Sequence, residues 1–209
     1  MDITIIGTGN MGRGLATRAL AGGHNVTLIG TDREKAQALA DELGQGGSGS
    51  IQVGESPTGD IVVLAVWYPV SIEVLGQYAD QLDGKVVVDI TNPIDTDAFE
   101  PLKPDAGSGA QELAAAAPDN VNIVKAFNTT FAGTLEPGEV SGHQLDVLIA
   151  GDDADAKATV AELVESGGMR AIDTGPLRRA REIEALGYLH MAVQDALGSG
   201  YGSAVKLIS

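Results

Sequence analysis

The sequence has no cysteine, and only three of its 209 residues are histidine. Without cysteine, the protein forms no disulfides and uses no thiolate as a nucleophile or metal ligand. So few histidines argue against a histidine-rich metal site, because imidazole is a common ligand of transition metals. We expect no metal site, and we expect all three histidines to be surface or packing residues. They are His24, His143 and His190.

Basic residues are also scarce, since 13 Lys and Arg stand against 29 Asp and Glu, which gives a net charge of −16. Such a surface repels nucleic acid and anionic membranes. The excess of acid fits either a salt-rich cytoplasm or ordinary solubility. Because cations are few, each Arg or Lys beside an expected anion site is informative.

Long apolar runs are missing as well, although 44% of the residues are hydrophobic and can fill a core. No run approaches the roughly 20 residues of a membrane-spanning helix. The apolar amino terminus, Met1 to Ile6, is shorter than the core of a signal peptide and lacks a basic flank. We therefore expect a soluble, cytoplasmic protein that binds neither a membrane nor nucleic acid.

Apolar runs rich in β-branched residues alternate with helical segments along the chain. Most of the runs are apolar on both faces, which is typical of a parallel sheet covered by helices on both sides. A flexible loop is expected at 44–50, and 91–109 is irregular. The predicted strands are 3–7, 25–29, 60–67, 85–90, 122–127, 146–151 and 169–175, and the predicted helices are 11–21, 32–44, 70–82, 110–118, 154–166 and 177–197.

The stretch "IIGTGNMGRG" carries G-x-G-x-x-G at Gly7, Gly9 and Gly12. It lies between a buried strand and a helix, in a βαβ unit of the right length, so it predicts a dinucleotide site. Gly7 allows the tight turn, Gly9 lets the backbone approach the pyrophosphate, and Gly12 lets the helix pack on the strand. We expect the whole turn to contact the cofactor, namely Gly7, Thr8, Gly9, Asn10, Met11 and Gly12.

These patterns predict an α/β fold, a Rossmann-type doubly wound parallel sheet with a small carboxyl-terminal α/β lobe that ends in a long helix. We place the nucleotide-binding domain at 1–135 and the lobe at 136–209. The chain beyond residue 130 is too short for a large catalytic domain, so it forms either a small lobe or a continuation of the sheet.

The residues after the second strand indicate which dinucleotide binds. An acid at the strand end would bind the adenosine ribose of NAD, and Asp32 has the right distance from the turn. That strand is expected to end at Ile29 or Gly30, however, so the acid's place is taken by Gly30. Thr31 and Glu34 have the spacing of a capping box, which puts Asp32 in the first turn of the helix.

An acid-free strand end leaves room for the 2′-phosphate of NADP. Thr31, the first-turn N–H groups and Arg33 can bind that phosphate, because a guanidinium offers a fork of donors. A solvated arginine is the alternative for Arg33, although a cation at a helix N-terminus is otherwise unfavourable. We therefore predict NADP rather than NAD.

Six stretches together resemble the family of NADP oxidoreductases that depend on the deazaflavin coenzyme F-420, and its related dinucleotide-binding reductases. The resemblance implies a Rossmann domain with a small carboxyl-terminal lobe that completes the substrate cleft, usually in a homodimer. It implies reversible hydride transfer between NADPH and the deazaflavin, held face to face. The stretches are "GTGNMGRGLA" with "IGTDREKA", "VVVDITNP", "VKAFNTTFAGTL", "DTGPLRRAREIEAL" and "GSGYGSAVKLI".

The resemblance also implies roles for particular residues. Thr31 and Arg33 match the 2′-phosphate readers. The stretch Val66, Trp67, Tyr68 and Pro69 matches the lining of the nicotinamide half. The ring-positioning candidates are Asn128, Thr129 and Thr130, where the two rings meet. Gly200 and Gly202 frame a tail that closes the cleft, and Asn92 lies in a loop at a carboxyl strand edge, where cofactors bind.

Two departures from the family keep the second redox partner open. Asp32 replaces an Arg that is frequent in the family, and Asn128-Thr129 replaces a His-Thr pair. The K-A-F-N-T element also occurs in relatives that reduce flavin, or metal ions through flavin. The hypotheses are a deazaflavin reductase, a reductase of flavin or a ferric acceptor, and a non-enzymatic NADP-sensing module. Lys125 is expected to bind an anion or to be structural rather than to act as a catalytic acid.

Overall fold

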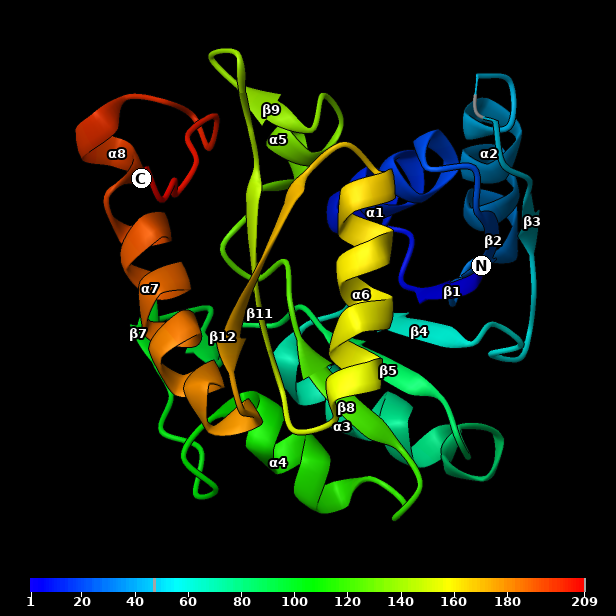
Figure 1. Ribbon diagram of the computed structural model, residues 1–209, viewed down its shortest axis with the longest axis horizontal. Helices are drawn as coiled ribbons and strands as arrows, with labels where there is room; N and C mark the ends of the chain where they lie inside the picture. The colour runs from blue at the N-terminus through cyan, green and yellow to red at the C-terminus, as the bar shows by residue number, and fades with distance from the viewer. Residues whose placement is uncertain (47, 209) are drawn as a thin grey trace.

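The computed structural model describes residues 1–46 and 48–208. One eight-stranded sheet runs through it in the order β12-β11-β8-β5-β4-β1-β2-β3 (Figure 1). Its strands are β1 (Asp2–Ile6), β2 (Asn25–Ile29), β3 (Ile51–Val53), β4 (Ile61–Leu64), β5 (Val86–Asp89), β8 (Asn122–Lys125), β11 (Asp146–Gly151) and β12 (Arg170–Gly175).

Helices flank the sheet, and two short antiparallel hairpins lie outside it. The helices are α1 (Asn10–Ala21), α2 (Arg33–Leu43), α3 (Tyr68–Gln77), α4 (Gly109–Ala116), α5 (Ala132–Leu135), α6 (Ala154–Ser166), α7 (Ala180–Ala192) and α8 (Gln194–Leu197), with 3-10 turns η1 (Ala79–Gln81) and η2 (Leu177–Arg179). The hairpins pair β6 (Ile94–Asp95) with β7 (Glu100–Pro101) and β9 (Glu139–Val140) with β10 (His143–Gln144).

The sheet buries both of its faces, as a doubly wound fold requires. Successive side chains of a strand point to opposite faces. In β4, Ile61 and Val63 therefore join the cluster that contains residues of α1, α2 and α6, while Val62 and Leu64 join the cluster of α3 and α4. The predicted double layer of helices is confirmed.

The strand order indicates where the ligand-binding crevice lies. The segment β3-β2-β1-β4-β5-β8 has the Rossmann order, in which the chain moves outward from β1 to β3 and returns to β4 on the other side of β1. All of these neighbours are parallel. Ligands bind outside the carboxyl ends of the strands at such a reversal, so the crevice lies beyond Ile6 and Leu64.

The carboxyl-terminal part continues the same sheet, but in the opposite direction. β11 pairs antiparallel with β8, and β12 pairs parallel with β11. The chain leaves β8 at the carboxyl edge and reaches β11 through only α5 and a short hairpin, without a crossover helix that would return it to the other edge. The boundary near residue 135 stays a prediction.

Several element boundaries differ from the predictions, and one strand was not predicted. β4 ends at Leu64 rather than at residue 67, and α3 begins at Tyr68 rather than at residue 70, with Pro69 in its first turn, where proline is favoured. Strand β3 was not predicted, because three residues are too few to show a period. Gly47, in the predicted loop 44–50, lies outside the described residues.

The predicted long helix 177–197 is three pieces, namely η2, α7 and α8. The side-chain amide of Gln194 donates to the carbonyl of His190 at 2.6 Å. A continuous helix would pair that carbonyl with the backbone N–H of Gln194. This competition coincides with the interruption at Val193, and Gly198, at φ +61°, ends α8.

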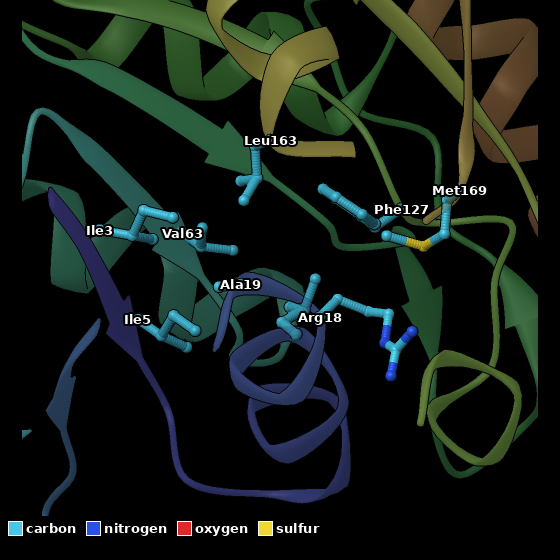
Figure 2. A pocket seen from close by; sticks show the side chains of 9 residues that line it. Ile3, Ile5, Arg18, Ala19, Val63, Phe127, Leu163 and Met169 are labelled. Carbon is cyan, nitrogen blue, oxygen red and sulfur yellow. The ribbon is translucent and has the colours of Figure 1, made fainter. Parts of the chain in front are cut away.

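The core between β1, β4 and α1 is closely packed. Figure 2 shows side chains of β1 and β4 facing α1 and Leu163 around a cavity of about 10 Å³. That volume is near the minimum for one water molecule, so the cavity is not a substrate site. None of the helices in the described part of the chain combines the length and apolar character of a membrane span.

Candidate functional site

The glycine-rich turn between β1 and α1 is shaped by close backbone approaches. Gly7 has φ +120°, and a Cβ there would lie 2.2 Å from the carbonyl oxygen of Ala65. A Cβ at Gly12 would lie 2.0 Å from the carbonyl oxygen of Gly7. Contacts this short exclude any side chain, so the turn exists because glycine occupies both positions.

Gly9 faces open space instead. A Cβ built there meets no atom within 4 Å. Gly9 is also the N-cap of α1 and makes no side-chain cap hydrogen bond, so the first-turn N–H groups and the positive end of the helix dipole point outward. This arrangement fits a pyrophosphate. Thr8, exposed Asn10 and Met11 belong to the same turn.

Position 30 leaves little room for a side chain beside Thr8. β2 ends at Ile29, within the predicted limit. A Cβ at Gly30 would lie 2.9 Å from Cγ2 of Thr8, in the phosphate turn. An Asp or Glu at this position would therefore require the Thr8 side chain to move.

Asp32, rather than Thr31, caps α2. The Asp32 carboxylate accepts from the backbone N–H of Lys35 at 3.1 Å, and the helix begins at Arg33. The predicted Thr31–Glu34 capping box is therefore wrong by one residue. Asp caps helices at least as well as Thr, because its carboxylate also favours the positive helix end. The Asp32 carboxylate is thus engaged by the backbone at the start of α2.

Arg33 lies exposed at the helix N-terminus, close to the end of β2. Its Nη1 donates to Glu55 Oε1 at 2.9 Å, and the Arg33 side chain is 64% exposed. Exposed Thr31 precedes the cap. The guanidinium is thus accessible to a ligand that approaches from solvent at this edge of the sheet.

The side chains of the stretch predicted to line the nicotinamide half point in different directions. Trp67 is 65% exposed beyond β4, whereas Tyr68 is buried and its hydroxyl donates to Glu112. Burial raises the pKa of Tyr68, and the neighbouring Glu112 raises it further, so the hydroxyl stays protonated. Val66 and Trp67 remain at the open edge, while Tyr68 packs against Gly109 of α4.

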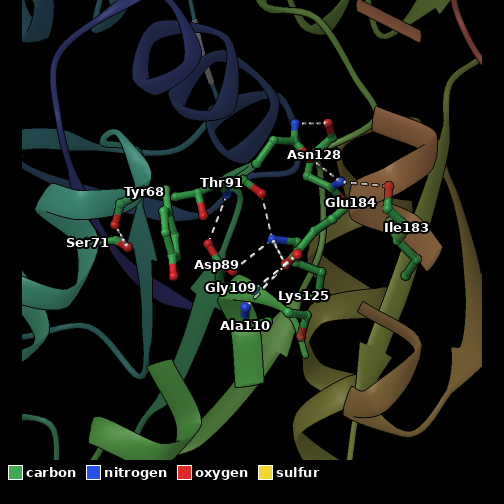
Figure 3. A network of polar contacts seen from close by, with 12 residues as sticks. Tyr68, Ser71, Asp89, Thr91, Gly109, Ala110, Lys125, Asn128, Ile183 and Glu184 are labelled. Atoms are coloured by element: carbon green, nitrogen blue, oxygen red, sulfur yellow. Dashed lines mark hydrogen bonds and ion pairs between the residues drawn. The ribbon is translucent and has the colours of Figure 1, made fainter. Parts of the chain in front are cut away.

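Lys125 sits in a buried ion cluster at the ends of β5 and β8 (Figure 3). Its Nζ lies 2.8 Å from Asp89 Oδ2, 2.9 Å from Glu184 Oε1 and 2.5 Å from the carbonyl oxygen of Thr91. These contacts use all three donors of the ammonium group. Because Lys125 is also fully buried, its geometry is that of a structural residue rather than a proton donor to substrate.

Glu184 joins α7 to the main sheet through the same cluster. Besides its contact with Lys125, its carboxylate accepts from the backbone N–H groups of Gly109 at 3.0 Å and Ala110 at 3.2 Å. These donors belong to the N-terminus of α4, which favours negative charge. No local pattern of the sequence indicates this role, because Glu184 on α7 and its partners on β8 and α4 come from three separate elements.

Asn92 and Asn128 lie side by side and hydrogen-bond to each other. Nδ2 of Asn128 donates to Asn92 Oδ1 at 2.8 Å and to the carbonyl of Ile183 at 3.0 Å, and Nδ2 of Asn92 donates to the carbonyl of Asn128 at 2.9 Å. Asn128 Oδ1 and Thr91 Oγ1 are buried polar atoms without a hydrogen-bond partner. Gly187 leaves room for this pair, since a Cβ there would lie 2.7 Å from Asn92 Oδ1.

Thr129 and Thr130 follow Asn128 in a tight turn. Both side chains are buried, and Thr130 Oγ1 donates to the carbonyl of Phe127 at 2.7 Å. Phe127 has φ +61°, which is strained for a residue with a side chain. The carbonyl of Thr129 lies 3.1 Å from His190 Nδ1. The segment is therefore rigidly placed at the carboxyl edge.

The glycine-rich tail folds over the end of this turn. Phe131 stacks on His190 with ring centroids 4.3 Å apart, and Tyr201 meets Phe131 edge to face at 5.0 Å. Tyr201 has φ +62° between Gly200 and Gly202, so the tail turns sharply there. Burial lowers the pKa of His190, which keeps the ring neutral at physiological pH. His24 is also buried and His143 exposed, as expected of surface or packing histidines.

A dinucleotide with a 2′-phosphate fits these features. Gly9 and the uncapped start of α1 fit the pyrophosphate, and Arg33 fits the 2′-phosphate. The unpartnered oxygens of Thr91 and Asn128 are hydrogen-bond acceptors at the far end of the same edge. Among residues 1–46 and 48–208, His, Asp and Glu form no cluster that would hold a metal ion.

Known proteins resemble this chain in both sequence and fold. Residues 2–93 match the family model described as NADP oxidoreductase, coenzyme F420-dependent. The chain is 32% identical over 203 residues to the F420-dependent NADP reductase of Methanothermobacter marburgensis, covering 89% of each chain. It is also 33% identical over 184 residues to Metalloreductase STEAP3 of Rattus norvegicus, but it spans only 36% of that protein.

One solved structure has the same fold over nearly the whole length of the chain. The chain matches a candidate F420-dependent NADP reductase from Arthrobacter sp. FB24 with a TM-score of 0.85 and 29% identity, covering 99% of each chain. The chain therefore belongs to the family of coenzyme F420-dependent NADP oxidoreductases, and it is an NADP-dependent oxidoreductase with a Rossmann-type fold.

Proposed function

We propose that the protein transfers a hydride between NADPH and the deazaflavin coenzyme F420 at the carboxyl edge of its sheet. The observation that carries this proposal is the length of the similarity. The chain covers 89% of an F420-dependent NADP reductase but 36% of a metalloreductase of similar identity. Similarity over 89% of a reductase with this named reaction supports the same reaction here.

The proposal assigns the two phosphate-bearing parts of NADPH to separate groups. The backbone around Gly9 binds the pyrophosphate, while Thr31 and Arg33 read the 2′-phosphate. Gly30 supports this assignment, because it follows the end of β2 and offers no carboxylate that would prefer NAD. The acid predicted by distance alone, Asp32, is committed to the helix cap.

The bound nicotinamide supplies the hydride, so the chain needs no nucleophile of its own. Its own residues bind and orient the two rings and exclude water. The Asn92–Asn128 pair fixes the 128–130 segment, where the side-chain oxygens of Asn128 and Thr91 still lack hydrogen-bond partners. Gly200 and Gly202 let the tail close over the rings, and the carboxyl-terminal lobe completes the cleft.

A reductase of flavin or of a ferric acceptor is the second candidate function. The similarity to Metalloreductase STEAP3, at 33% identity over 88% of this chain, favours it. The same dinucleotide site would serve both reactions, since the two differ only in the acceptor of the hydride. The acceptor therefore decides between them.

The test is steady-state oxidation of NADPH with coenzyme F420, FMN, FAD and a ferric chelate in parallel. We expect turnover with F420 at a kcat/KM at least about a hundredfold above that with the other acceptors, because the proposed cleft holds a specific ring. Faster turnover with FMN or FAD would replace the proposal with the second candidate. Turnover with none of the four would exclude both.

A further inference from the structure

An exposed ion pair joins two parts of the chain at the carboxyl edges of β2 and β3. Arg33 Nη1 lies 2.9 Å from Glu55 Oε1, and the two side chains are 64% and 84% exposed. Arg33 is the first residue of α2, and Glu55 comes two residues after β3. The pair therefore lies where a nucleotide bound at the end of β2 would place its adenosine ribose.

The backbone holds Glu55 beside Arg33. The N–H of Gly54 donates to the carbonyl of Leu28 at 2.9 Å, which extends the pairing of β3 with β2 by one residue. The hydroxyl of Tyr78 donates to the carbonyl of Glu55 at 3.5 Å. These hydrogen bonds fix the backbone at Gly54 and Glu55, within reach of Arg33.

We propose that Glu55 limits the preference for NADPH over NADH by competing with the 2′-phosphate for Arg33. This inference rests on the proposed function, which assigns the 2′-phosphate to Arg33. Carboxylate and phosphate oxygens use the same kind of donor on a guanidinium, so the two acceptors compete for the N–H groups of Arg33. NADH has no 2′-phosphate and leaves the ion pair intact.

Charge repulsion adds to the competition. A phosphate monoester carries roughly −1.5 to −2 charges at pH 7, and it would bind beside the Glu55 carboxylate. Asp32 and Glu34 are also nearby in sequence, but they lie at the N-terminus of α2, where negative charge is favourable. Glu55 lies outside any helix, so its charge opposes the phosphate without that compensation.

The experiment measures binding of 2′,5′-ADP and 5′-AMP to the whole protein by isothermal titration calorimetry. These probes share the adenosine and differ in the 2′-phosphate, and they need no hydride acceptor. Glu55→Gln keeps the side-chain shape and removes the charge. We expect it to bind 2′,5′-ADP about three- to tenfold more tightly, as an exposed pair plus local repulsion allows, with 5′-AMP unchanged. The gain should shrink at high salt.

Two further variants separate the causes. Glu165→Gln, on exposed α6 surface, makes the same change in net charge and should leave both affinities unchanged. In an Arg33→Ala background, Glu55→Gln should improve 2′,5′-ADP binding less than in the parent, because only the repulsion remains. An equal gain in both backgrounds would overturn competition for Arg33.

The outcomes distinguish this inference from the function on which it rests. If the parent protein binds 2′,5′-ADP no tighter than 5′-AMP, the NADP assignment itself fails. If the parent prefers 2′,5′-ADP but Glu55→Gln leaves that affinity unchanged, only the role of Glu55 fails. Weaker binding in Glu55→Gln would also overturn it, because Glu55 would then position Arg33 for the phosphate.

Discussion

At the scale of single residues, two glycines of one motif have different physical roles. Gly12 is enclosed, because a Cβ would meet the carbonyl of Gly7, whereas Gly9 faces open space. The fold requires glycine at position 12, whereas at position 9 we propose that a bound ligand requires it. The motif alone does not distinguish them, since both are glycine at prescribed positions.

Gly9→Ala should therefore fold normally and bind NADPH at least about tenfold more weakly, because its methyl group enters the pyrophosphate position. Its free energy of unfolding should change by less than about 0.5 kcal/mol. Gly12→Ala is the matched comparison and should lose about 1–3 kcal/mol or more through overpacking. Urea denaturation and NADPH titration check both. A Gly9→Ala protein with unchanged NADPH affinity would show that the pyrophosphate binds elsewhere.

Arg33→Ala should weaken NADPH binding about tenfold to a hundredfold while NADH binding stays the same, because a charge-assisted hydrogen bond to the 2′-phosphate is lost. Fluorescence titration of both dinucleotides measures the two affinities. Arg178→Ala, at an exposed position of η2, is the control for loss of one positive charge. Equal losses for NADPH and NADH would refute the phosphate-reading role.

At the scale of elements, the buried cluster of Asp89, Lys125 and Glu184 fixes α7 against the sheet. One ammonium group meets two carboxylates, and the N-terminus of α4 compensates the second. A cluster of this kind stabilises only while it is complete, because a lone buried charge is costly. It therefore determines where α7, with Gly187 and Ile183, meets Asn128.

Glu184→Ala should lower the free energy of unfolding by about 3–5 kcal/mol, since it leaves Lys125 with one carboxylate and two N–H groups of α4 unpaired. Urea denaturation at pH 7 measures the change. Glu182→Ala removes a carboxylate two positions away whose ion pairs are exposed, so it should change stability by less than about 1 kcal/mol. Similar effects of the two substitutions would contradict the importance of the cluster.

At the scale of the whole molecule, the tail is tied to the far edge of the sheet by Asp146. Its carboxylate accepts from Arg170 at 2.8 Å, from Lys206 at 2.5 Å and from the backbone N–H of Leu207 at 2.8 Å. Burial alone would raise the pKa of Asp146, but these partners lower it to about 2. The segment from α8 to Leu207 is thus part of the fold.

Asp146→Asn should lower stability at pH 7 by about 1–2 kcal/mol. Because the pKa of Asp146 is depressed in the folded state, its contribution is complete above about pH 4 and is lost as the pH falls toward 2. The parent and variant curves should therefore converge over that range. Urea denaturation between pH 2 and 7 provides the comparison, with Asp119→Asn as an exposed control. Parallel curves down to pH 2 would contradict the role of this carboxylate.

The homodimer expected from the family is a prediction about the same region. Exposed apolar side chains gather on α7, α8 and the tail, including Leu189, Leu197 and Leu207. We expect a dimer in light scattering after size exclusion, and a monomer for the double variant Leu189→Glu and Leu197→Glu. Leu102→Glu, exposed near the β6–β7 hairpin, should remain dimeric. A parent protein that is monomeric at micromolar concentration would refute the prediction.

Local pattern determined the parts of the fold that depend on neighbours in the chain. The alternation of strands and helices, the turn from Gly7 to Gly12 and the end of β2 at Ile29 were all predictable, because periodicity and glycine geometry act over a few residues. The helix cap was misplaced by one residue, since Thr31 and Asp32 are both good caps and only their backbone angles decide between them.

Which side chains contact each other depends on the tertiary structure. Tyr68 turns inward to Glu112, Lys125 is enclosed by Asp89 and Glu184, and Arg33 pairs with Glu55. The antiparallel pairing of β11 with β8 was likewise not predicted from the sequence. In each case the partners come from different elements, and their contact depends on how the sheet and helices pack, which no local period of the sequence records.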